Sequence, residues 1–169
     1  MTREQATAPS APGSFHKPDE NRCFTVVSEG RTFGLPVESI QTVFEMVALT
    51  PVPLAPYEIL GLVNLRGKIV TAVSLRRRLK ADAHAVETSM LAIGMEHRGE
   101  SFALVVDEVG DVIILDPGTR IVTPPHLGAE GIKISAVHRL DAMILPLLDL
   151  DWVFTFSRAT EVRPLVSTL

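Results

Sequence analysis

The chain contains very little cysteine and few aromatic residues. Cys23 is the only cysteine among 169 residues, so a disulfide within the chain and a metal site built from several cysteines are both excluded. One tryptophan, one tyrosine and a formal net charge of −4 provide neither stacking surfaces for bases nor a basic excess for phosphates. The composition therefore argues against a small-barrel nucleic-acid-binding module, which is the main alternative from another functional class.

Long apolar segments are also missing. No run approaches the roughly 20 apolar residues that a membrane-spanning helix needs, and the polar N-terminal sequence lacks the apolar segment of a signal peptide. We therefore expect a soluble protein of the cytoplasm, without membrane insertion. Hydrophobic residues make up 46% of the chain, which is enough for the core of one medium domain or two small ones.

No set of residues with a catalytic or metal-binding spacing is present. The chain has no nucleophile elbow, no P-loop and no dinucleotide fingerprint. Asp107 and Asp111 would share a face of a strand, but two carboxylates are too few for a hard cation. We expect all five histidines to lie on the surface: His16, His84, His97, His126 and His138. The sequence thus predicts no enzymatic activity, no metal and no cofactor.

What the chain does contain is a series of short apolar segments separated by turn residues. They predict about ten short strands at spacings of roughly 8 to 14 residues. No helical pattern of about 10 to 15 residues separates these segments, so a doubly wound parallel sheet is not expected. The predicted fold class is mainly β.

The segment from Leu60 to Leu79 is the clearest of these patterns. Two apolar runs flank a short polar step, which predicts a β-hairpin. Gly67 permits the backbone angles of the turn. Arg66 places a fixed charge at the same turn, where it either points into water or is held by an acceptor and presented to a partner.

Three neighbouring segments have simpler interpretations. Pro36 is followed by four apolar residues at helical spacing, which predict a helix of about two turns: Val37, Ile40, Val43 and Phe44. Three prolines between Ala48 and Tyr57 predict an extended connection without a central strand. The basic cluster of Arg76, Arg77, Arg78 and Lys80 is expected to form a solvated helical turn.

The chain also contains an internal echo. Residues Ile69–Leu75 match Ile144–Leu150 in pattern after a shift of 75 positions, which predicts two similar small barrels packed together with a groove between them. We expect a disordered tail at 1–22, barrels at 23–80 and 81–156, and a C-terminal tail at 157–169. Elements at the ends of each barrel are allowed to cross to the other one.

The hairpin and four further landmarks resemble one known family. The stretch Gly61–Val70, followed by Leu75 and Arg76, resembles the N-L-R-G signature of the chemotaxis coupling protein CheW. The other landmarks appear in the family's order: Phe33–Val37, Thr50–Pro53, Val105–Val109 and Leu145–Leu150. The resemblance covers the chain from about Cys23 to Phe156.

The resemblance implies two five-stranded SH3-like barrels with short helices and no active site. It implies an adaptor that joins the cytoplasmic tips of chemoreceptors to a CheA-type histidine kinase in signalling arrays. The receptor's helical hairpin would lie in the groove between the barrels, near Ile40, Asn64, Arg66 and Ile69. The kinase's regulatory domain would bind the first barrel edge on, near Phe44, Glu45, Met46 and Val47. Gly61 and Gly67 would be the structural turn glycines.

Some positions depart from the family's pattern. The family usually carries a glutamate two residues after the position of Ile40, where this chain has Thr42. A hydroxyl accepts a neutral hydrogen bond and cannot replace a bidentate carboxylate, so Glu38 or Glu45 are candidate partners for Arg66. The alternative function is therefore an adaptor of a divergent chemosensory pathway that controls something other than swimming.

Overall fold

The computed structural model describes residues 21–79, 89–128 and 131–156, which form eleven strands and five short helical segments. The strands are β1 (Arg22–Ser28), β2 (Arg31–Pro36), β3 (Ile40–Glu45), β4 (Ile59–Leu65), β5 (Lys68–Ser74), β6 (Leu91–His97), β7 (Glu100–Val105), β8 (Glu108–Ile114), β9 (Arg120–Ile121), β10 (Ile134–Leu140) and β11 (Met143–Leu148). The helical segments are η1 (Val37–Ser39), α1 (Leu75–Arg78), η2 (Pro117–Thr119), η3 (Pro125–Leu127) and α2 (Leu150–Phe154). The mainly β prediction is confirmed.

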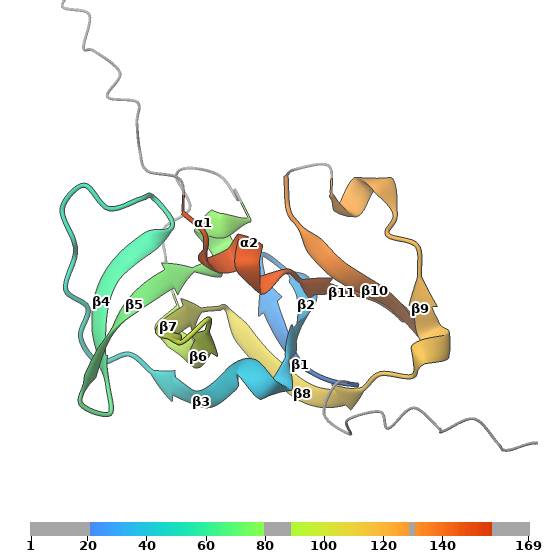
Figure 1. Ribbon diagram of the computed structural model, residues 1–169, viewed down its shortest axis with the longest axis horizontal. Helices are drawn as coiled ribbons and strands as arrows, with labels where there is room; N and C mark the ends of the chain where they lie inside the picture. Colours follow the sequence, from blue (N-terminus) through green and yellow to red (C-terminus); the bar gives the residue numbers. More distant parts are fainter. Residues whose placement is uncertain (1–20, 80–88, 129–130, 157–169) are drawn as a thin grey trace, which may run out of the picture.

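The strands form two curved sheets that lie side by side (Figure 1). One has five strands in the order β3-β6-β7-β5-β4, and the other has six in the order β8-β1-β2-β11-β10-β9. The sixth strand of the second sheet, β9, is two residues long and pairs with β10. Five strands were expected in each unit, so this short edge strand is an addition to the predicted architecture.

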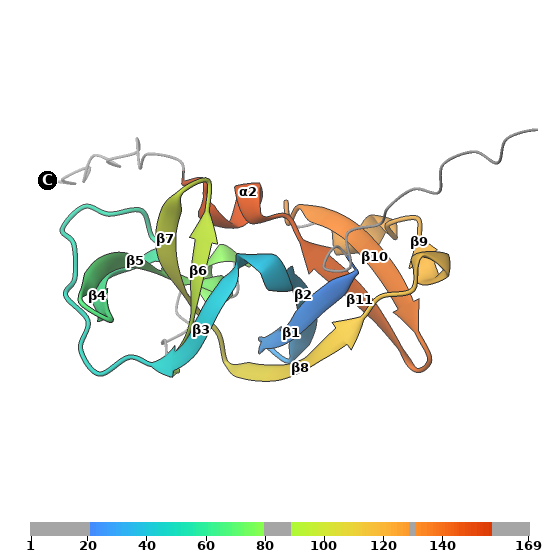
Figure 2. The same ribbon diagram turned by 60° about the horizontal axis from the view of Figure 1, so that its bottom comes forward.

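Each half of the chain contributes strands to both sheets. The N-terminal hairpin of β1 and β2 pairs with β8 and β11, as Figure 2 shows, whereas the later hairpin of β6 and β7 pairs with β3 and β5. The exchanged hairpins stand at the starts of the expected barrel ranges, 23–80 and 81–156, for which crossing of end elements was allowed. The edges that each hairpin needs for its backbone hydrogen bonds are supplied by the other half.

The two sheets repeat one topology, which accounts for the echo in the sequence. The order β3-β6-β7-β5-β4 corresponds to β8-β1-β2-β11-β10, with the parallel pairing of β5 and β7 matched by that of β11 and β2. A short helix follows β5 and another follows β11. Ser74 and Asp149, which are 75 positions apart, accept backbone N–H hydrogen bonds at the first turns of these helices.

The largest core cluster lies between the sheets. It is formed by buried apolar side chains of both: Val26, Phe33, Leu35 and Leu148 from one sheet, and Val73, Ile93, Met95 and Leu104 from the other. A smaller cluster fills the inside of the five-stranded sheet, and another lies under β1 and β11. Because apolar burial is the main favourable term in folding, the shared cluster holds the two sheets together as one body.

The five-stranded sheet closes on itself after β3. Thr50 and Leu62 of β4 exchange two backbone hydrogen bonds of 2.8 Å each, which join the chain leaving β3 to the far edge of the sheet. Gly61 makes this contact possible, since a Cβ there would lie 2.3 Å from the carbonyl oxygen of Thr50. Gly61 was expected at the turn but lies inside β4, where its role is close backbone approach.

The predicted helix after Pro36 is wrong. Val37–Ser39 forms a single 3₁₀ turn, and the residues that follow form β3, which pairs along β6. Their side chains alternate, with Thr42 and Phe44 half-buried and Gln41 and Glu45 exposed. The free edge of β6 decides the outcome here, because pairing along a whole strand outweighs a short helical pattern. The extended proline connection between Ala48 and Tyr57 is present, with no helix or strand.

Both ends of the chain and two internal ranges are outside the described residues. Residues 1–20, 80–88, 129–130 and 157–169 are not among the described residues, and these ranges include most of the predicted tails, Lys80 and two of the histidines. Arg22, which was expected in the N-terminal tail, is the first residue of β1. None of the helices in the described ranges is long and apolar enough to cross a membrane.

Replacing Gly61 with Ala tests the closure of the five-stranded sheet. The added Cβ would collide with the backbone of Thr50, so we expect a loss of about 2 kcal/mol or more in the free energy of unfolding. Gly128→Ala is the matched control, because its Cβ meets nothing closer than 3.8 Å, and it should change stability by less than about 0.5 kcal/mol. Urea denaturation measures both, and equal stabilities would contradict the closure.

Candidate functional site

Three hairpins turn through the same pair of residue types, a charged residue followed by glycine. The charged residues are Glu29, Arg66 and Arg98, with φ values of 55°, 52° and 51°, and each is followed by a glycine that also has a positive φ. The left-handed region costs a residue with a Cβ about 1 kcal/mol. Each hairpin therefore presents one charged side chain at a strained position.

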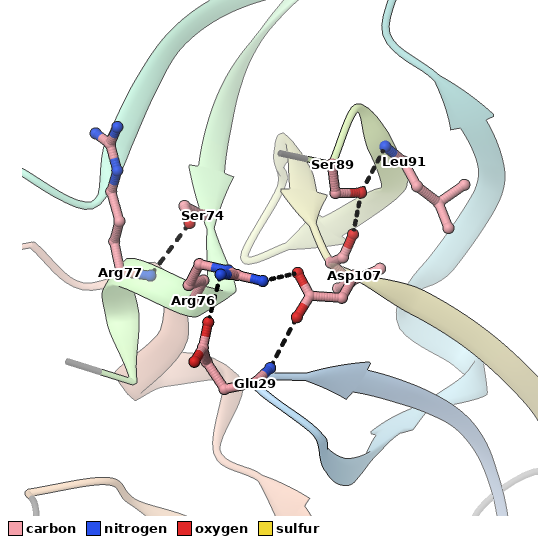
Figure 3. A network of polar contacts seen from close by, with 8 residues as sticks. Glu29, Ser74, Arg76, Arg77, Ser89, Leu91 and Asp107 are labelled. Carbon is pink, nitrogen blue, oxygen red and sulfur yellow. Dashed lines mark hydrogen bonds and ion pairs between the residues drawn. The ribbon is translucent and has the colours of Figure 1, made fainter. Parts of the chain in front are cut away.

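The charge of Glu29 is used to join the two sheets. In Figure 3, Arg76 of α1 pairs with Glu29 at 2.6 Å and with Asp107 at 2.9 Å, and the backbone N–H of Glu29 donates to Asp107 at 2.8 Å. Arg76 lies in α1, directly after β5 of the five-stranded sheet, whereas Glu29 belongs to the turn between β1 and β2 of the six-stranded sheet. Asp107, weighed from the sequence as a cation ligand, is held in this network instead.

A second contact between a short helix and a hairpin turn has the charges reversed, with the carboxylate on the helix and the arginine at the turn. Asp151 of α2 pairs with Arg98 and with His97, both at 2.7 Å. Asp151 lies 75 positions after Arg76, and Arg98 occupies the turn of β6 and β7 as Glu29 occupies that of β1 and β2. The hydrogen bond from His97 is the main cause that lowers the pKa of Asp151, and the Arg98 guanidinium lowers it further. Each sheet thus supplies a helix that pairs with a hairpin of the other.

The other described arginines of the basic cluster also make contacts, so the expected solvated turn is corrected. Arg78 donates to the carbonyl oxygens of Trp152 and Thr155, which lie at the end of α2, and its guanidinium lies 4.6 Å from the centre of the Trp152 ring. Arg77 donates to the carbonyl oxygen of Tyr57 at 3.0 Å. The cluster anchors α1 to neighbouring segments.

Arg66 lies at the turn between β4 and β5. In Figure 1 the tip of this hairpin lies at the same end of the five-stranded sheet as β3. Its Nη2 donates to the hydroxyl of Thr42 at 3.3 Å. The partner left open from the sequence, Glu38 or Glu45, is therefore Thr42, which contacts the arginine from β3. Asn64 accepts a 2.8 Å hydrogen bond from the N–H of Gly67, which stabilises the turn.

Three of the four residues expected at the receptor groove lie on one hairpin. Asn64 of β4 is directly opposite Ile69 of β5, and both are exposed together with Arg66. The fourth, Ile40, is half-buried at the start of β3 and packs against the core between the sheets. The hairpin and β3 are brought together by the contact between Arg66 and Thr42.

The four residues expected at the kinase differ in their accessibility. Val47 is 96% exposed and Glu45 is also exposed, whereas Met46 is 3% exposed and Phe44 packs against the interior of the five-stranded sheet. Only alternate side chains of this segment are available to a partner. Sequence reasoning missed four exposed apolar residues nearby, which stand in β3 and the proline-rich connection without a periodic pattern: Val43, Val52, Leu54 and Tyr57.

One histidine contradicts the expectation that all are on the surface. His138 is buried in β10, and its Nδ1 lies 2.9 Å from the hydroxyl of Thr119. Burial is the main cause that lowers its pKa, and the charge of Arg120 lowers it further. Of the other histidines in the described ranges, His97 contacts Asp151 and His126 is exposed. Nowhere in those ranges do three metal-ligating side chains converge.

The fold is that of a small, mainly β protein whose two sheets exchange hairpins. The family model of the CheW-like domain matches residues 22–157. The chain therefore belongs to the CheW-like domain family, a family of non-catalytic adaptors in chemotaxis. The prediction that it is not an enzyme is confirmed by this membership.

Individual relatives agree with the family. The chemotaxis protein CheW of Bacillus subtilis (strain 168) is 29% identical over 137 residues, which cover 80% of this chain and 87% of the relative. The chemotaxis protein CheW of Rhizobium meliloti (strain 1021) is 29% identical over 108 residues, 62% of this chain and 68% of that protein. The scaffolding protein TtCheW from Thermoanaerobacter tengcongensis has the same fold, with a TM-score of 0.70 at 21% identity over 85% of this chain and 98% of its own.

Replacing Arg76 with Met tests whether the Glu29–Arg76–Asp107 network stabilises the pair of sheets. The Arg76 and Asp107 side chains are only 20% and 19% exposed, so we expect a cost of about 2 kcal/mol, between the values for exposed and buried pairs. Arg98→Met is the matched control, because Arg98 is 74% exposed, and its effect should be smaller. Thermal and urea unfolding provide the measurement, and equal effects would show that the network adds nothing beyond a surface pair.

Proposed function

We propose that the protein couples the cytoplasmic tips of chemoreceptors to a CheA-type histidine kinase in membrane-associated signalling arrays. The observation that carries the proposal is the pair of accessible surfaces on the five-stranded sheet. One is the charged tip of the β4–β5 hairpin, and the other is the segment after β3, in which Val47 is 96% exposed. Both include residues that the family resemblance assigns to partners.

The hairpin tip has the chemistry to hold a helix. An exposed apolar side chain, Ile69, lies opposite the amide of Asn64, and Arg66 adds a positive charge beside them. A helix laid against such a surface gains affinity from apolar burial and orientation from the charge. Each contact can be weak, because an array multiplies the contacts between its members.

The exposed segment is suited to a second protein. Val47 and Leu54 are almost fully exposed, and Val43, Val52 and Tyr57 are also exposed, all in β3 or in the connection between β3 and β4. Exposed apolar side chains in one segment are candidate contacts for a partner protein. The exposed carboxylate of Glu45 adds a polar group to the same segment. We assign this segment to the regulatory domain of the kinase.

The alternative, an adaptor of a divergent chemosensory pathway, rests on Thr42. The hydroxyl of Thr42 that accepts from Arg66 is neutral, so it does not compensate the positive charge of the arginine. Such a change alters which receptor is preferred without changing the adaptor role.

Two single substitutions separate the two surfaces. Arg66→Ala should weaken binding to a receptor-tip fragment about tenfold and leave kinase binding unchanged, because it removes a charge from the hairpin alone. Val47→Asp should do the reverse, since it replaces an exposed apolar side chain by a charge. Pull-down and calorimetric titration with a receptor fragment and with the kinase's regulatory domain measure both effects. Wild-type protein that binds neither partner would contradict the proposal.

A control addresses folding. Both positions are exposed, so both variants should unfold at the wild-type temperature. Loss of binding to both partners by either folded variant would show that the two surfaces are not separate.

A further inference from the structure

Of the three charged residues that precede glycine in the hairpin turns, Arg66 is used differently from the others. Glu29 forms an ion pair with Arg76, and Arg98 forms one with Asp151. Within residues 21–79, 89–128 and 131–156, Arg66 makes a hydrogen bond to the Thr42 hydroxyl and no ion pair. At this strained turn Arg66 therefore carries a positive charge that no carboxylate of these residues pairs with.

The surroundings of Arg66 form a small pocket with a positive lining. Its volume is about 130 Å³, and its lining consists of Gln41, Thr42, Leu65, Arg66, Lys68, Val70 and Ser101. Two of these residues carry positive charge and none carries a carboxylate. The carboxylate of Glu96 lies beyond this lining, where it accepts a 2.9 Å hydrogen bond from the amide of Gln41, and among the described residues it forms no ion pair with Arg66 or Lys68.

The pocket combines the groups that a carboxylate needs. The guanidinium of Arg66 can donate two parallel hydrogen bonds to a carboxylate, and Lys68 adds a second charge at the same rim. The hydroxyls of Thr42 and Ser101 are further polar groups, and Leu65 and Val70 are apolar and buried. At about 130 Å³, the space is below the roughly 300 Å³ of typical small-molecule sites and suits one inserted side chain.

We propose that this pocket binds the carboxylate of an aspartate or glutamate on the helical hairpin of the receptor. The inference rests on the proposed function, because the receptor supplies the side chain. Charge complementarity selects the occupant, since two uncompensated cations around a polar pocket favour an acidic side chain over a neutral or basic one. Thr42 sets this specificity, because a neutral residue there leaves the guanidinium available to the partner.

The matched pair Thr42→Glu and Thr42→Gln tests the inference on the full chain. Glutamate at position 42 should pair with Arg66 and occupy the pocket, so binding to a chemoreceptor tip fragment should fall on the order of tenfold. Glutamine has the same size without the charge and should retain most of the binding. Thermal unfolding of both variants checks that each one folds.

A second experiment identifies which carboxylate of the receptor fragment contacts Arg66. Each carboxylate of the receptor fragment is changed to its amide in turn, and binding is measured by calorimetry against wild type and Arg66→Ala. We expect one carboxylate whose loss weakens binding on the order of tenfold with wild type and has no further effect with Arg66→Ala.

The outcomes separate the two proposals. Loss with Thr42→Glu but not Thr42→Gln, together with one coupled carboxylate, supports the inference. Equal binding by Thr42→Glu and Thr42→Gln, or coupling to no carboxylate, overturns it while the adaptor function stands. No binding of the fragment by the wild-type protein overturns both.

Discussion

The exchange of hairpins between the two halves of the chain is the constraint on which the rest of this structure depends. Because β1 and β2 complete the sheet of the later half and β6 and β7 complete that of the earlier half, neither half can form a full sheet alone. The core cluster between the sheets adds apolar burial to this topological link. The two sheets are thereby fixed relative to each other.

An adaptor benefits from such a fixed arrangement. In one ion pair a helix supplies the cation, Arg76, and a hairpin turn supplies the anion, Glu29. In the equivalent pair the charges are reversed, with Asp151 on the helix and Arg98 at the turn, so each sheet is tied to a hairpin of the other. Preorganised surfaces lose less entropy when they bind than flexible ones do. The hairpin tip at Arg66 and the exposed segment at Val47 are carried by this one body, which suits a protein whose proposed role is to hold partners at set positions.

Much of the fold was predictable from the sequence, because turns and strands have local signals. The glycine and charged residues at 66–67 marked the hairpin, and the match of Ile69–Leu75 with Ile144–Leu150 marked the repeat. The helix expected after Pro36 was wrong, since the edge of β6 that pairs with β3 lies far along the chain. Which hairpin joins which sheet, the partners of Arg76 and the burial of Met46 are likewise set by tertiary contacts, so composition and spacing could not show them.

Native-state hydrogen exchange measured residue by residue tests the central claim, that the exchanged hairpins make the two sheets one cooperative unit. The most informative backbone amides are those of strands in the shared core, such as Val26 and Leu35 in one sheet and Ile93 and Leu104 in the other. The account predicts that the slowest amides of both sheets open with the same free energy, equal to that of global unfolding. Opening of one sheet at a clearly lower free energy, while the other stays protected, would contradict it.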